Sequence, residues 1–181
     1  MASLGNGGQD RQARVPLIGR EGRAVVLEKK RDAEYTFRSD WWLPTLPGRV
    51  FDAIVDLESY PRWWPDVQSV RQVDDDTAQV VCRSRLPYRI VVAMHREQQD
   101  AAGLRVRVRL SGDLDGLLAG AIHADGAGSR LEITQHVQVR KPLLRRLDVI
   151  ARPFFRANHA WMMRRGHHGL TGYLAATGRA T

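Results

Sequence analysis

The fold is decided by residues 34–65, which read EYTFRSDWWLPTLPGRVFDAIVDLESYPRWWP. Apolar and polar side chains alternate through the start of this stretch, with Tyr35 and Trp41 on the apolar face, which predicts a strand with one buried side. Pro47 then begins a segment with apolar residues at helical spacing, which predicts a helix. Because two prolines stand near the end of the stretch, only a short helical turn is expected there.

Strand patterns continue beyond this stretch. The clearest is in residues 104–110, where leucine and valine side chains alternate with Arg105, Arg107 and Arg109. The connections between the strands are too short for parallel crossovers, so the sheet is predicted to be antiparallel. The further predicted strands span residues 67–73, 77–86, 88–98, 104–110, 113–124 and 130–140.

A long helix is predicted after Pro142, with a kink or a restart at Pro153. A sheet of about seven strands needs an element of this size over its apolar face. The predicted class is therefore α+β: a curved antiparallel sheet of about seven strands wrapped around a long C-terminal helix, with two short helices after the first strand and a cavity in between. The apolar stripe of the helix consists of Phe155, His159, Met162, Gly166, Leu170 and Tyr173.

The chain of 181 residues is long enough for one domain, which we place at residues 34–178. Residues 1–33 lack a sustained apolar period, so we predict a mobile basic extension. The net charge of +8 belongs to the two ends, because residues 140–181 hold nine basic side chains and one acidic side chain. Such a segment is typical of a solvated helix face, and it also suits a weak contact with an anionic membrane surface.

Several other function classes find little support in the sequence. The one cysteine, Cys82, excludes an internal disulfide. No apolar run is long enough for a membrane span or a secretory signal, so a cytoplasmic protein is expected. No phosphate loop or dinucleotide motif is present, and His159, His167 and His168 lack the spacing of a metal site, so no cofactor and no metal are expected. The arginines of residues 104–110 have no stacking aromatics beside them, which argues against nucleic acid.

Four short sequences, at defined places in this order of elements, resemble a known superfamily. They are Val50-Phe51-Asp52-Ala53-Ile54, Tyr60-Pro61-Arg62-Trp63-Trp64-Pro65, Gly112-Asp113-Leu114-Asp115-Gly116, and Phe155-Arg156-Ala157-Asn158-His159 leading to Met162-Met163-Arg164-Arg165-Gly166. With them, residues 34–177 resemble the START-like, Bet v 1-like superfamily, and within it the polyketide cyclase/dehydrase-like group. The resemblance implies a helix-grip fold with a deep hydrophobic cavity. Its members bind lipids, sterols, polyketides or other apolar molecules, and only some are enzymes, so the resemblance implies a cavity and not a reaction.

The resemblance also implies where a ligand would lie. It places Trp63 and Trp64 at the lid over the cavity mouth, where flat aromatic faces suit an apolar ligand. On the helix, Met162 is an adaptable gap filler and Gly166 leaves room beside the cavity, although core packing explains the methionine equally well. His159 must find a polar partner, either within the core or on the ligand. The predicted ligand-binding residues are Trp41, Trp63, Trp64, Tyr88, Phe155, His159, Met162, Gly166 and Tyr173.

Three functions stay open on this evidence. The first is non-catalytic binding of a small hydrophobic molecule, lipid or polyketide-like, by a monomer or a homodimer. The second is a polyketide cyclase, aromatase or dehydratase, for which the resemblance implies Arg83 or Arg85 as oxyanion donor and Tyr88 as proton donor, with His159 as a further candidate. Strand alternation places both arginines out of phase with Cys82, which favours the outer face of the sheet. The third is a peripheral membrane or partner-binding module that uses the basic C-terminal helix.

Overall fold

The computed structural model describes residues 34–83, 89–140 and 148–178. The predicted extension, residues 1–33, lies outside the described residues, and so do Arg85 and Tyr88. The elements, in chain order, are β1 (Glu34–Leu43), α1 (Pro47–Val55), the 3-10 turn η1 (Leu57–Ser59), α2 (Tyr60–Trp63), β2 (Val67–Gln72), β3 (Thr77–Arg83), β4 (Arg89–Asp100), β5 (Arg105–Gly112), β6 (Leu114–Asp125), β7 (Gly128–Val139) and α4 (Asp148–Thr177).

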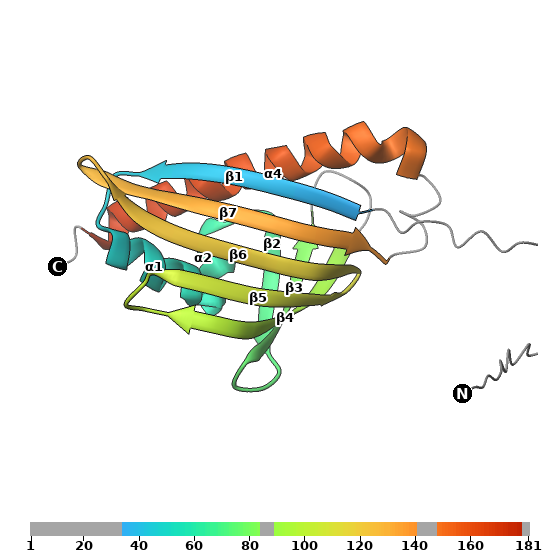
Figure 1. Cartoon of the computed structure of the whole chain (residues 1–181), viewed down its shortest axis with the longest axis horizontal. Helices are drawn as coiled ribbons and strands as arrows, with labels where there is room; N and C mark the ends of the chain where they lie inside the picture. The colour runs from blue at the N-terminus through green and yellow to red at the C-terminus, as the bar shows by residue number, and fades with distance from the viewer. Residues whose placement is uncertain (1–33, 84–88, 141–147, 179–181) are drawn as a thin grey trace, which may run out of the picture. The chain divides into compact units, whose positions relative to one another are not determined.

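The strands form one seven-stranded antiparallel sheet in the order β1-β7-β6-β5-β4-β3-β2. The sheet curves, and α1, α2 and α4 lie on its concave side (Figure 1). Bulges in β2, between Val67 and Ser69, and in β4, between Arg96 and Gln98, interrupt the regular register. Since bulges increase local bending and twist, they help the sheet to curve around the helices. The predicted α+β helix-grip class is therefore confirmed.

The register of β1 on β7 shows how the first stretch of sequence directs this fold. Trp41 pairs with Leu131 and Leu43 pairs with Ser129, so the apolar face of β1 continues the concave face of the sheet. Trp41 and Leu43 are buried together with Phe51 of α1 in the larger hydrophobic core. The alternation predicted for this strand therefore separates a buried face from an exposed face.

Helix α4 runs as one helix through Pro153, so the restart expected there does not occur. From Pro153 onward, where its side chains are described, the buried residues of α4 are Met163, Gly166, Leu170 and Leu174. The predicted stripe includes Gly166 and Leu170, while Met163 and Leu174 each lie one residue away from a predicted member. Among the described residues, no helix is both long and apolar enough to cross a membrane.

Two glycines bring α4 into close contact with α2. A Cβ atom on Gly166 would lie 2.6 Å from Cε2 of Trp64, and a Cβ atom on Gly169 would overlap the carbonyl oxygen of Trp63. Glycine is therefore required at these positions by the packing of the two helices. This contact holds Trp63 of α2 and Trp64, the residue after it, over the concave face of the sheet.

Candidate ligand cavity

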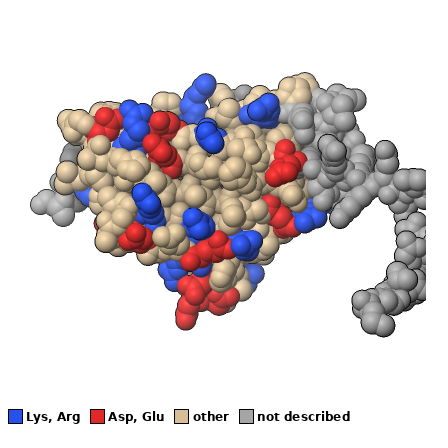
Figure 2. Space-filling view, viewed as in Figure 1, with Lys and Arg blue, Asp and Glu red and all other residues tan. Residues whose placement is uncertain are grey.

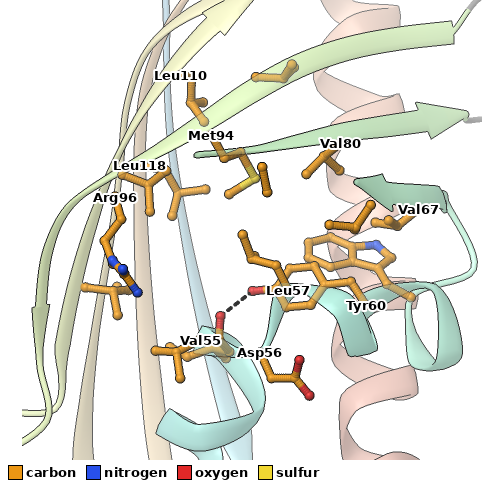
Figure 3. A pocket seen from close by; sticks show the side chains of 18 of the residues that line it. Val55, Asp56, Leu57, Tyr60, Val67, Val80, Met94, Arg96, Leu110 and Leu118 are labelled. Atoms are coloured by element: carbon orange, nitrogen blue, oxygen red, sulfur yellow. Dashed lines mark hydrogen bonds between the residues drawn. The ribbon is translucent and has the colours of Figure 1, made fainter. Parts of the chain in front are cut away.

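A cavity of about 440 Å³ lies between the concave face of the sheet and the helices. Its volume falls in the range typical of small-molecule sites. Figure 3 shows aliphatic side chains from the strands pointing into this space from one side and the residues of α1, η1 and α2 facing them. The apolar lining of the sheet consists of Val67, Val70, Ala78, Val80, Val92, Met94, Val106, Val108, Leu110, Leu118, Gly120, Leu131 and Ile133.

Aromatic rings form the helical wall of the cavity. Trp63 and Trp64 stack with ring centroids 5.5 Å apart, and Trp41 meets Trp64 edge to face at 5.9 Å. The indole N–H groups of Trp63 and Trp64 are bound by the protein: Nε1 of Trp63 donates to Ser59 Oγ at 3.1 Å, and Nε1 of Trp64 donates to the carbonyl of Met162 at 3.1 Å. The rings are thus fixed in orientation and offer apolar surface to the cavity.

Tyr60 completes this wall. Its hydroxyl donates to the carbonyl oxygen of Ile54 at 2.7 Å, the hydrogen bond drawn in Figure 3. Burial, with a further contribution from the charge of Asp56, raises the pKa of Tyr60 well above its ordinary value. The phenol therefore stays protonated, and its proton is directed at the backbone.

The exposed part of the lining carries five carboxylates, beside three glutamines and one arginine. Asp56 and Glu58 come from the segment after α1, and residues 74–76, all aspartates, form the tip of the β2–β3 hairpin. Figure 2 shows acidic side chains gathered at that tip. Backbone and side-chain hydrogen bonds from Asp76 and Thr77 lower the pKa of Asp74, so it is charged at neutral pH. We call these five carboxylates the acidic mouth.

One arginine stands within the acidic mouth. Arg96 points into the cavity from β4 (Figure 3), and its guanidinium donates to Asp76 Oδ1 from Nε at 2.9 Å and from Nη2 at 2.5 Å. A third hydrogen bond, of 3.1 Å, runs from Nη1 to Gln99 Oε1. Its charge is therefore paired within the protein, and the carboxylates outnumber it.

One polar side chain stands in the apolar row that β7 turns toward the cavity. Gln135 lines the cavity in phase with Leu131 and Ile133. Its Oε1 accepts a hydrogen bond from Nε2 of His159 at 3.0 Å, and its Nε2 donates to Sδ of Met163 at 3.8 Å.

A thiol and a carboxyl group close to it have raised pKa values. The Cys82 thiol lines the cavity, and burial, with the nearby charge of Asp66, raises its pKa to about 11, so it remains a thiol at neutral pH. Asp66 is 1% exposed, and its Oδ1 accepts a 3.0 Å hydrogen bond from Arg165, whereas its Oδ2 has no partner among the described residues. Burial outweighs the effect of Arg165 and raises the pKa of Asp66.

The predicted ligand-binding residues divide into three sets. Trp41, Trp63, Trp64 and Met162 line the cavity. Phe155, His159, Gly166 and Tyr173 are absent from the described lining: His159 contacts the lining residue Gln135, Gly166 packs under Trp64, and Phe155 and Tyr173 pack against the two hydrophobic cores. Tyr88 lies outside the described residues.

The predicted catalytic residues are not brought together in the described part of the chain. Arg83 is exposed at the end of β3 and does not line the cavity, in keeping with its phase along the strand, and Arg85 lies outside the described residues. Within the described ranges no group of three or more His, Cys, Asp or Glu side chains is arranged to hold a metal ion.

Sequence reasoning missed Gln135, Met163 and the acidic mouth. Gln135 had a signal, because it interrupts the alternation of residues 130–140 at a position where the phase predicts an apolar residue. The aspartates at residues 74–76 fall between two predicted strands, 67–73 and 77–86, which indicates a turn. That interpretation is right for the backbone, but the sequence does not show that the turn borders a cavity.

A curved sheet around a long helix, with an apolar cavity between them, is the helix-grip architecture of the START-like, Bet v 1-like superfamily. A family model described as polyketide cyclase / dehydrase and lipid transport matches residues 43–174, and the chain belongs to this family. A search of curated proteins returned no match.

Solved structures show the same fold at low sequence identity. The protein TTHA0849 from Thermus thermophilus matches with a TM-score of 0.70 and 18% identity, over 79% of this chain and 99% of that one. The Zhui aromatase/cyclase from a Streptomyces species matches with a TM-score of 0.67 and 11% identity, over 79% and 94%. A START superfamily protein from Mycobacterium smegmatis gives 0.62 and 11%, over 80% and 98%.

Proposed function

We propose that this protein binds a small, uncharged hydrophobic molecule, lipid or polyketide-like, in the cavity between the sheet and the helices. The observation that carries the proposal is the cavity itself: about 440 Å³, walled by aliphatic side chains on one side and by fixed tryptophan rings on the other. Binding of an apolar molecule in such a space is favourable because it removes apolar surface of both ligand and protein from water. Membership of a family described as polyketide cyclase / dehydrase and lipid transport supports the same class of ligand.

The choice of an uncharged ligand comes from the acidic mouth. Five carboxylates border the opening, and the arginine among them is paired with Asp76. An anionic ligand would pass them against Coulomb repulsion and would leave its charge in an apolar interior. A neutral molecule meets neither obstacle.

Binding without chemistry is favoured by the state of the described lining. Tyr60 directs its proton at a backbone carbonyl, Cys82 stays protonated, and Arg83 is exposed outside the lining. A cyclase would need an acid or a base that can exchange a proton with the ligand near neutral pH, and these three groups do not supply one. The cyclase alternative therefore depends on Arg85 and Tyr88, which lie outside the described residues, and remains a prediction.

The proposal is tested by filling the cavity from one strand. Leu118 lines the cavity, and Leu117, next to it on β6, does not. Leu118→Trp places an indole in the cavity, and Leu117→Trp makes the same change on the opposite face of the strand. We expect N-phenyl-1-naphthylamine, an uncharged apolar fluorophore, to bind the unaltered protein and the Leu117→Trp variant, and to lose at least tenfold in affinity for Leu118→Trp.

Native and denaturing mass spectra of the purified protein then identify a bound molecule. A co-purifying neutral apolar compound that is lost in Leu118→Trp would support the proposal. If the fluorophore binds both tryptophan variants equally while their circular dichroism spectra match that of the unaltered protein, the cavity is not the binding site and the proposal fails.

A further inference from the structure

Gln135 is a polar residue in a row of apolar side chains on β7. The side chains that β7 turns to the concave face are Leu131, Ile133, Val137 and Val139, all buried or half-buried, and Gln135 stands in the middle of them. A carboxamide taken out of water needs hydrogen-bond partners, or its burial costs free energy. Its partners therefore show which of its atoms the protein uses and which remain for a ligand.

The oxygen of this carboxamide is held by His159. Nε2 of the imidazole lies 3.0 Å from Oε1, and the ring stacks on Phe37 with centroids 3.8 Å apart and planes 15° apart. Burial lowers the pKa of His159 to about 4, so the ring is neutral at physiological pH and has a single N–H. Because Oε1 is an acceptor, that proton is on Nε2. The stacked ring therefore fixes which way the carboxamide faces.

The nitrogen of the same carboxamide has a weaker partner. Its contact is Sδ of Met163 at 3.8 Å, and a thioether is a poor acceptor. On the helical wall of the cavity, polar hydrogens are committed to stronger acceptors: Tyr60 to a backbone carbonyl, Trp63 to a hydroxyl and Trp64 to a backbone carbonyl. The amide N–H of Gln135 is thus a donor in the apolar lining that a better acceptor would engage.

We propose that the amide N–H of Gln135 donates a hydrogen bond to a carbonyl oxygen of the bound ligand, and that His159 is a positioning residue that orients this amide. The inference rests on the proposed function and deepens it, because it narrows the ligand class from apolar molecules to uncharged apolar molecules that carry a carbonyl group. A hydrocarbon in the same cavity would fill the space, but the amide N–H of Gln135 would then keep only the sulfur of Met163 as its partner. The cavity would therefore distinguish two ligands of one shape by a single oxygen.

A matched pair of probes tests this. Benzophenone and diphenylmethane have the same two rings and differ only in the bridging group, C=O or CH₂. Their dissociation constants are measured by displacement of N-phenyl-1-naphthylamine from the full chain. The quantity compared is the preference, the ratio of the diphenylmethane constant to the benzophenone constant, since general damage to the cavity weakens both probes together.

In Gln135→Met, which keeps the length of the side chain and removes the amide, we expect the preference to fall about two- to twelvefold, the range for loss of one hydrogen bond. Gln138→Met is the matched control: the same substitution on the same strand but outside the cavity lining, with the preference expected to stay unchanged. Gln135→Leu gives a second variant if the methionine does not fold.

His159 is tested through the same ratio. His159→Phe keeps a ring to stack on Phe37 but loses the hydrogen bond to Gln135, so the preference should fall at least threefold. His159→Gln supplies an amide N–H in place of the imidazole N–H and should restore most of the preference. If the preference falls equally in His159→Phe and His159→Gln, the histidine contributes packing alone and does not orient the amide of Gln135.

The outcomes separate this inference from the proposed function. If all three probes bind and Gln135→Met changes the preference no more than Gln138→Met does, the role of Gln135 is refuted while ligand binding in the cavity stands. If none of the probes binds the unaltered protein, both proposals are refuted.

Discussion

At the scale of single residues, the ion pair of Asp66 and Arg165 leaves part of a buried carboxylate without a partner in the described part of the chain. The carboxylate is 1% exposed, and one of its oxygens has no partner among the described residues. We predict that Arg165→Met lowers the free energy of unfolding by roughly 1–3 kcal/mol at pH 7, because it leaves a buried carboxylate unpaired. Urea denaturation, followed by circular dichroism, measures this loss.

The loss should depend on pH in a defined direction. Without the arginine the pKa of Asp66 rises further above that of the unfolded chain, so the folded variant takes up a proton more readily than the unfolded one as the pH falls. The deficit relative to the unaltered protein should therefore shrink between pH 7 and pH 5. Asp66→Asn combined with Arg165→Met should show no such recovery. An equal deficit at both pH values would contradict the prediction.

His159 gives the opposite dependence in the unaltered protein. Its pKa is about 4 in the folded state, below the ordinary value of 6.5, so the unfolded chain binds the extra proton first as the pH falls. The stability that this group contributes is thus present at pH 7 and decreases through the range from 6.5 to 4. We predict that His159→Gln removes a decrease of roughly 1–2 kcal/mol between pH 7 and pH 5. The free energy of unfolding of both proteins is measured by urea titration at each pH. The prediction is contradicted if it falls equally in the two proteins between pH 7 and pH 5.

At the scale of elements, the contact between α2 and α4 depends on two glycines, and a third glycine serves as an internal reference. A Cβ on Gly169 would overlap a carbonyl oxygen of the backbone, which cannot rotate away, whereas a Cβ on Gly172 meets nothing within 4 Å. We predict that Gly169→Ala destabilises by roughly 1–3 kcal/mol, and that Gly172→Ala stabilises by roughly 0.5–1 kcal/mol through helix propensity. Thermal melts of the two variants should shift in opposite directions, and shifts of the same sign would contradict the packing described here.

Most of the elements could be predicted from the sequence, because local patterns determine them. Alternation predicted all seven strands, and the predicted bounds of β2 and β6 differ from the observed ones by one residue at each end or less. Pro153 shows the limit of local rules: it removes one backbone donor near the start of a long helix, and the rest of that helix is packed against the sheet and α2. The sequence alone does not show how that tertiary packing weighs against the proline.

The candidate site was less predictable, because it depends on which faces meet across the cavity. The family resemblance placed Trp63 and Trp64 at the cavity mouth, and helical spacing placed Met162 on the stripe of the long helix; all three line the cavity, as does Trp41. The hydrogen bond between Gln135 and His159 joins residues on a strand and a helix, and no sequence spacing encodes it. Its strand partner was nevertheless visible as a polar residue in an apolar row. Polar interruptions of an alternating pattern therefore indicate candidate ligand contacts as well as strand ends.

At the scale of the whole domain, the charges are unevenly placed around the cavity. The basic residues that made the C-terminal segment a candidate membrane contact include Arg165, paired with Asp66, and Arg140, paired with Asp115, and the side chains of residues 141–152 lie outside the described set. The described opening of the cavity is acidic. The negative charge at the opening should therefore weaken the binding of anionic ligands and leave the binding of uncharged ligands unaffected.

The last prediction concerns this effect. Dodecanoate and dodecanol have the same chain and differ in charge, and Glu58 and Asp75 belong to the acidic mouth. We predict that Glu58→Gln with Asp75→Asn strengthens dodecanoate binding about two- to fivefold at low ionic strength and leaves dodecanol binding unchanged, because two nearby charges are removed. The gain should largely disappear at 1 M salt, where screening extends only about 3 Å. Glu34→Gln with Glu132→Gln removes two exposed carboxylates outside the cavity lining and should have no effect on either ligand. If this control pair strengthened dodecanoate binding as much as the mouth pair, net charge and not the position of the carboxylates would govern the selection.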